Sequence, residues 1–191
     1  MATVDLSKSP YFDSFDKDKN YVKVAAVADR PLQQRELNEM QSILSNKIRG
    51  IGDGVFKDGA ILTGLGYNPK TSADKSTVTI NIQPGTMYIG GNVLSVGAQS
   101  VTIPATGDAY VYATYTDSIV TAADGKSLYD PTSTTIQGAD RLKGAVSLTT
   151  APVDDTSVVL YHFQDGLLYI DSSIPVSDNI MRVLAHSVAV S

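Results

Sequence analysis

Hydrophobic residues follow two different periods along the chain, and the change falls near residue 50. Residues 77–82 alternate strictly, with Val78, Ile80 and Ile82 on one face and polar residues on the other. Strict alternation is typical of a half-buried strand. Comparable runs, separated by Gly, Pro and Asp, continue through residues 87–163. The pattern predicts an antiparallel β domain over residues 51–191, built as a β-sandwich or a barrel-like sheet.

The clearest hairpin of this domain centres on the Asp-Gly pair at residues 165–166. This dipeptide favours a type I′ turn of two residues. Closure by such a turn predicts that Phe163 pairs with Leu168. Alternation then places Phe163 in the core, and Leu160 and His162 on the opposite face.

The segment 29–50 predicts a single amphipathic helix near the N-terminus. Asp29 precedes Pro31 at its start, and Gly50 follows Lys47 and Arg49 at its end. These are the residue types that begin and end helices. The sequence therefore predicts a mainly β fold with one N-terminal helix.

Within this helix Leu37, Met40, Leu44 and Ile48 form an apolar stripe about three turns long. Such a stripe packs either on the sheet of its own chain or against the same stripe of other copies. In the second interpretation the helices surround the axis of a homo-oligomer. Both interpretations remain open from the sequence.

Residues 1–28 predict an arm followed by a short strand. Tyr11, Phe12 and Phe15 are the large apolar groups of the arm, and residues 21–27 carry the β-prone run of the strand. An arm this short cannot fold alone, so its aromatic side chains predict docking, onto the chain's own core or onto a neighbouring subunit.

The charge distribution supports this division of the chain. Of the 20 acidic residues only Glu36 and Glu39 are glutamates, and the formal net charge is −5. Aspartate collects at turns and caps, which fits a chain of many strands. The acidic charge disfavours nucleic acid and anionic membranes as partners. The sequence contains neither an export signal nor a window apolar enough for membrane insertion.

Candidate chemistry is sparse. His162 would lie diagonal to Asp171 across the hairpin, and residues 16–20 imitate half of a calcium loop but continue with Tyr21 where glycine is required. We predict no catalytic, cofactor-binding or metal-binding residue, and hence no enzyme. Tyr110 and Tyr112 share one face of a strand, which suits a structural contact or, alternatively, the stacking of a glycan.

Three motifs carry a family resemblance. In order they are Y-F-D-x-F-D-x-x-K-N at residues 11–20, L-Q-x-R-E-L-N-x-x-Q-S-I-L at 32–44 and G-D-x-x-F-K-D-G at 52–59. The combination resembles a family of tailed-bacteriophage virion proteins that are associated with the tail fibre or the baseplate.

The resemblance implies a homo-oligomer, specifically a trimer, anchored on the phage tail by its N-terminal region. It implies a structural protein of the virion that attaches a tail fibre or receptor-binding element to the baseplate, with other tail proteins as partners and with assembly in the host cytoplasm. The alternative function is a carbohydrate-recognising module that binds the host receptor through Tyr110 and Tyr112.

Overall fold

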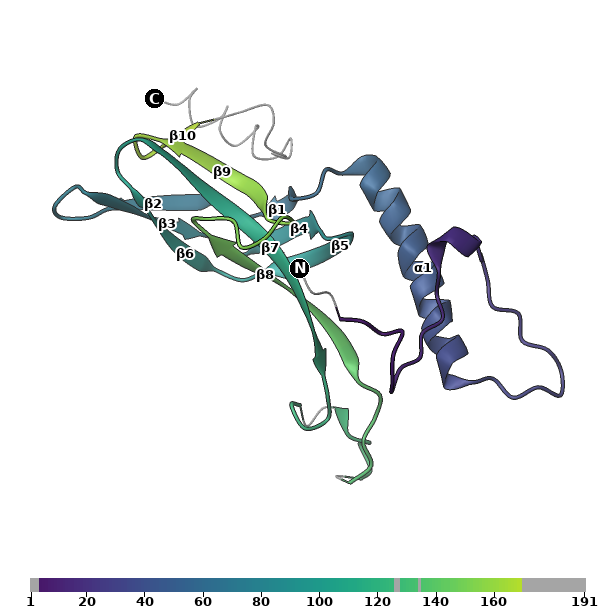
Figure 1. Ribbon diagram of the computed structural model, residues 1–191. Coiled ribbons are helices and arrows are strands. Elements are labelled where there is room, and N and C mark those ends of the chain that lie inside the picture. The colour runs from purple at the N-terminus through teal and green to yellow at the C-terminus, as the bar shows by residue number, and fades with distance from the viewer. Residues whose placement is uncertain (1–3, 126–127, 134, 170–191) are drawn as a thin grey trace. The chain divides into compact units, whose positions relative to one another are not determined.

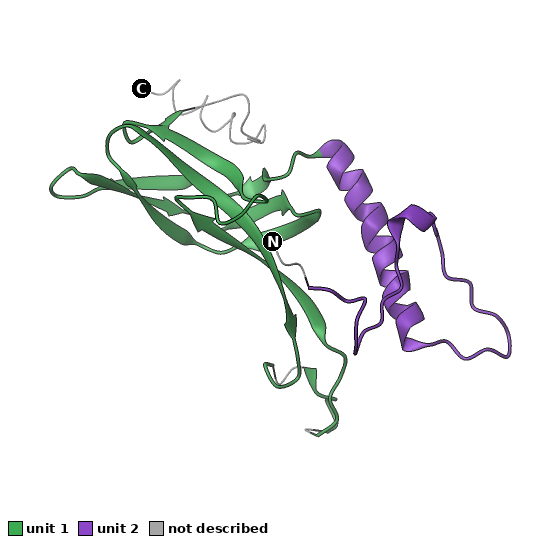
Figure 2. Cartoon of the chain, in the orientation of Figure 1, with its two compact units in different colours: residues 1–3, 56–191 green, residues 4–55 purple. Residues whose placement is uncertain are grey.

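The computed structural model describes residues 4–125, 128–133 and 135–169. The chain forms two compact units, shown in purple and green in Figure 2. The N-terminal unit is Val4–Val55, and the β unit comprises residues 56–191 with residues 1–3. Three antiparallel sheets and one α-helix make the described part of the chain mainly β, as predicted.

The β unit contains three sheets, labelled in Figure 1. The first has the order β1 (Ala60–Gly64), β4 (Gly85–Ile89), β5 (Asn92–Val96). The second has the order β2 (Tyr67–Thr71), β3 (Thr77–Ile82), β6 (Gln99–Pro104). The third has the order β10 (Leu167–Tyr169), β9 (Val158–Gln164), β7 (Asp108–Val120), β8 (Arg141–Thr149). Strands β5 and β6 contact the third sheet, which gives a sandwich-like arrangement.

The core of the β unit lies between these sheets. Alternation in β3 buries Val78, Ile80 and Ile82 as predicted, because its other face carries the threonines and asparagine. The largest fully buried side chains come from strands of all three sheets and from the turn after β1: Phe163, Ile61, Leu65, Ile80, Ile82, Met87, Ile89, Ile103, Leu160, Val111 and Thr114.

Two polar side chains join segments across this core. The Gln99 amide on β6 donates to the Val146 carbonyl at 3.1 Å and accepts from the Leu148 N–H at 3.0 Å, so it continues the ladder of β8. The buried Tyr161 hydroxyl donates to the Leu65 carbonyl. Burial of the phenol, and to a smaller extent the nearby Tyr67, raises the pKa of Tyr161 far above its usual value. The phenol is therefore a permanent donor that satisfies a buried carbonyl.

The hairpin of β9 and β10 has the predicted register, with Phe163 opposite Leu168. Asp165 and Gly166 both have positive φ, as a type I′ turn requires. The prediction that Leu160 faces outward is wrong, because Leu160 is buried. The pairing of β9 with β7 shifts register beside this residue, and the bulge turns two consecutive side chains inward.

The helix α1 (Gln34–Val55) differs from its predicted bounds at both ends. It begins later than Asp29, and the Glu36 carboxylate caps it by accepting from the Gln33 N–H at 2.7 Å. It also passes through Gly50 and ends five residues beyond it. The helix is not N-terminal in the strict sense, because residues 1–33 precede it. Residues 21–27, predicted as a strand, carry no regular secondary structure.

Candidate functional site on the N-terminal helix

The arm, residues 4–33, binds one side of α1 through hydrogen bonds. The Asn38 amide donates to the Tyr11 carbonyl at 2.8 Å, and the Ser42 hydroxyl donates to the Asp13 carboxylate. In the opposite direction, the Ser14 hydroxyl donates to Glu39 at 2.8 Å. These bonds join residues 25 to 29 positions apart. They make the arm and the helix one structural element, which we call the clamped helix.

Local hydrogen bonds shape the arm between these attachments. The Asp16 carboxylate caps a short 3₁₀ helix, η1 (Lys17–Lys19), by accepting from the Asp18 N–H at 3.0 Å. Asn20 ends this helix in the left-handed region, where asparagine is tolerated. The run that imitates a calcium loop therefore uses its first carboxylate as a helix cap. Within residues 4–125, 128–133 and 135–169, no three acidic, His or Cys side chains could together hold a metal ion.

The apolar side of α1 is exposed. The predicted stripe continues past Gly50 through Ile51 and Val55, so that its members are Leu37, Met40, Leu44, Ile48, Ile51 and Val55. Their side chains expose between 45% and 70% of their surface. Ile43 is the buried residue of the helix, and it lies outside this set. From here on, "the stripe" means these six residues.

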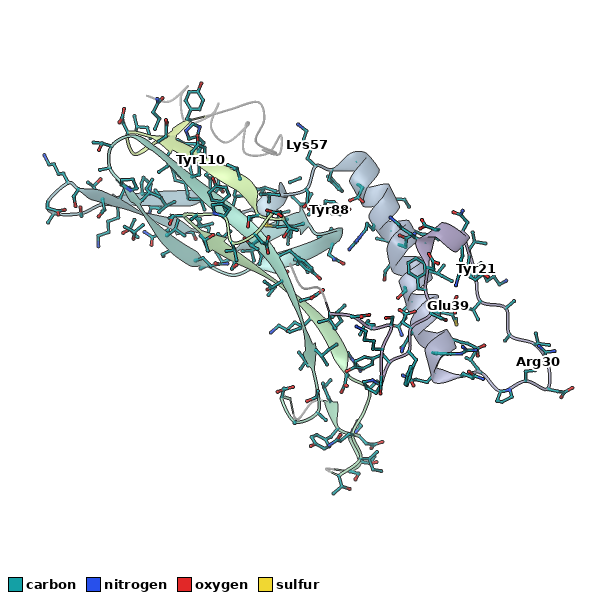
Figure 3. All side chains as sticks on the ribbon, viewed as in Figure 1. Tyr21, Arg30, Glu39, Lys57, Tyr88 and Tyr110 are labelled. Atoms are coloured by element: carbon teal, nitrogen blue, oxygen red, sulfur yellow. The ribbon has the colours of Figure 1, made fainter. Side chains whose placement is uncertain are left out.

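The arm and the stripe occupy different sides of the helix. At 3.6 residues per turn the six stripe residues fall within an arc of about 80°. Of the residues that bind the arm, Asn38, Ser42 and Glu39 lie about 120–160° from the middle of this arc. Gln34 and Lys47, which donate to backbone carbonyls of the arm, lie about 80° and 60° from it. Figure 3 labels Glu39 on the helix. The polar side of the helix is thus occupied within its own unit, and the arm leaves the apolar side uncovered.

The three aromatic residues of the arm behave differently from one another. Tyr11 and Phe15 are half-buried, whereas Phe12 exposes 53% of its surface and has a positive φ. The hydrogen bonds from the arm to its own helix use backbone carbonyls and small polar side chains, and Tyr11 and Phe15 are partly covered as well. Docking of Phe12 onto a neighbouring subunit stays a prediction.

A second cluster surrounds His162 on β9. Its ring stacks on Tyr110 of β7, with ring centroids 4.3 Å apart and planes 13° from parallel, and Tyr169 packs edge-on at 5.0 Å. The His162 Nε2 lies 3.1 Å from the Asp108 carboxylate. The acid beside His162 is therefore Asp108, whereas Asp171, the predicted partner, lies outside the described residues.

This stacking limits what the tyrosines of β7 can bind. A glycan stacks on an open ring face, yet His162 occupies one face of Tyr110, which Figure 3 labels on the sheet. Tyr112 lies 6.2 Å from Tyr110, with the two rings tilted by 44°. The arrangement resembles the cross-strand aromatic contacts that stabilise sheets. Glycan binding by this pair stays a prediction.

Comparison with protein families gives one result that covers nearly the whole chain. Residues 9–188 match the family described as a domain of unknown function, DUF4815. The chain belongs to the DUF4815 family. The match begins inside the arm and continues through α1 into the β unit, so the clamped helix is part of the DUF4815 domain itself. No curated protein and no solved structure matches the chain.

In this DUF4815 chain the predicted interface residues separate into two groups. Leu37, Met40, Leu44 and Ile48 share one exposed side of α1, as the periodicity indicated. The arm aromatics belong instead to the segment that follows the other side of the helix. Among the helices of the described residues, none combines the length and apolar character needed to cross a bilayer.

The sequence reasoning missed two kinds of residue in the DUF4815 domain. Ile51 and Val55 lie beyond Gly50, the predicted end of the helix, although the apolar spacing continues through them. The polar residues that hold the arm were also missed. They include Gln34, whose side-chain amide donates to the Pro10 carbonyl at 3.1 Å and to the Tyr11 carbonyl at 3.3 Å. The signal in the sequence is the spacing of four between Gln34, Asn38 and Ser42, which places three small or amide side chains in one row.

Proposed function

We propose that the chain is a structural protein of a bacteriophage virion that attaches a tail fibre or receptor-binding element to the tail baseplate. It does so as a homo-oligomer, a trimer, in contact with other tail proteins. The ordered motifs at residues 11–20, 32–44 and 52–59 support the phage assignment. The exposed stripe on the clamped helix supports assembly, because large exposed apolar surfaces mark interaction sites.

The stripe is the observation that carries the assembly part of this proposal. Six aliphatic side chains in one row are costly to leave in water, since each buried methylene contributes about 0.8 kcal/mol. If the arm packed against this row, the chain itself would shield these side chains from water. The arm instead uses hydrogen bonds on the polar side, which keeps the stripe available to another molecule.

Immunogold electron microscopy of particles from a phage that encodes the chain tests the virion assignment. We expect label at the baseplate end of the tail, and we expect particles made without the chain to have tails that lack fibres. A capsid protein serves as the positive control for labelling. Label on the capsid, or purified particles without the chain, would contradict the proposal.

A further inference from the structure

The spacing of the stripe residues indicates how a partner helix can pack along them. Its six members are separated by 3, 4, 4, 3 and 4 positions. This is one complete 3-4-4 group, an 11-residue repeat, followed by the first two spacings of a second, in place of the 3-4 alternation of a heptad. An 11-residue repeat corresponds to 3.67 residues per turn, close to the 3.6 of a straight helix. The stripe consequently runs almost parallel to the axis of α1 for about 27 Å.

The charges of the helix favour identical copies as that partner. In a ring of copies one border of each stripe faces the other border of the neighbouring copy, so charges of one sign on both borders would repel each other. Arg35, Glu39, Arg49 and Asp53 lie about 140–180° from the middle of the stripe. On one border the nearest neighbours are Gln41, Ser45 and Gly52, which are uncharged.

The other border carries two charged residues, and the chain itself engages both. The Lys47 ammonium donates to the Val22 carbonyl at 2.8 Å. The Glu36 carboxylate accepts from the Gln33 N–H at 2.7 Å. Both charges are thereby held by backbone groups of their own unit. In a ring of copies this border faces the uncharged border of the next copy, so no like charges meet along the stripe.

We propose that the stripe binds the stripes of other copies of this chain, with the helices parallel, in register and nearly straight or slightly right-handed in their supercoil. The inference rests on the homo-oligomer of the proposed function and specifies how it is built. A closed ring of copies around an axis along α1 requires parallel helices. Each arm then lies on the outside of the bundle, where it follows the polar side of its own helix.

Single-cysteine variants test this arrangement, because the chain contains no cysteine. Leu37→Cys and Val55→Cys place thiols at the two ends of the stripe. Asn46→Cys is the matched control, since Asn46 is exposed and lies about 160° from the middle of the stripe. Each full-length variant is oxidised with a mild copper catalyst and examined on a non-reducing gel, and circular dichroism verifies that the helix is retained.

Parallel copies in register predict that Leu37→Cys and Val55→Cys each form disulfide-linked dimers alone, whereas Asn46→Cys remains monomeric on the gel. Cross-linking only in a mixture of Leu37→Cys and Val55→Cys would establish antiparallel helices and overturn the inference. A monomer in light scattering without cross-links would show that the β unit or another protein covers the stripe. These results are independent of the gold label on particles, so either proposal can fail alone.

Discussion

Replacing Leu44 by aspartate is the sharpest perturbation of the stripe. Leu44 exposes 59% of its surface in the single chain. Complete burial of a leucine side chain contributes about 1.5–3 kcal/mol, so covering the exposed part contributes about 1–2 kcal/mol per chain. In the proposed trimer, three copies together would lose about 3–5 kcal/mol, a reduction of roughly 10²–10⁴ in the association constant. Three carboxylates around one axis add repulsion to this value.

Light scattering coupled to size exclusion, at micromolar concentration, measures the result. We expect Leu44→Asp to elute as a monomer with its helix content retained, because Leu44 contributes little to the folded single chain. Asn46→Asp introduces the same charge on the other side of α1 and should leave the oligomer intact. An unchanged oligomer in Leu44→Asp, or equal dissociation in Asn46→Asp, would refute the reasoning.

Three further predictions concern the helix, the arm and one turn. Gly50→Ala should raise the free energy of unfolding by about 1 kcal/mol in thermal circular dichroism, because no atom beyond the neighbouring residues and backbone of the helix itself lies within 4 Å of the added methyl group; a lower stability would contradict this. Asn38→Ala removes the bond to the Tyr11 carbonyl, worth about 1 kcal/mol, so proteolysis of the arm should become about five-fold faster; unchanged cleavage would show that the clamp does not hold the arm. Hydrogen bonds, first from the Ser72 hydroxyl, lower the pKa of Asp74 to about 2. Because the folded-state pKa is depressed, the stabilisation is present above pH 4 and is lost as the pH falls towards 2. A carboxyl NMR titration should therefore give a higher pKa for Asp74 in Ser72→Ala, and an identical pKa would refute this cause.

The sequence predicted those features that depend on local pattern. Alternation in residues 77–82 is visible because one face of β3 is buried and the other is polar, and the Asp-Gly turn sets the register of the last hairpin. The inward position of Leu160 could not be predicted, since the bulge is a property of the pairing between β7 and β9. Pairings of that kind join segments far apart in the chain.

The end of α1 shows how a local signal misleads. Glycine in a helix interior costs about 1 kcal/mol, and the last six residues of α1 contain Gly50, Gly52 and Gly54. Propensity alone therefore predicts an earlier end. Ile51 and Val55 extend the stripe by about two further turns, and their burial against other copies would offset much of that cost. The side of α1 to which the arm binds could not be predicted either. Hydrogen bonds between residues 25 to 29 positions apart leave no periodic pattern of hydrophobic residues in the sequence.

The position of the clamp in the chain also affects the timing of biogenesis. Every hydrogen bond described between the arm and α1 is made by residues before position 48. The sequence continues for 136 residues after Val55, the last residue of the helix, and the ribosome adds all of them after the helix is made. At 5–20 residues per second this takes about 7–27 s. Chains growing on one messenger RNA could thus join by their helices during translation, before their β units are complete.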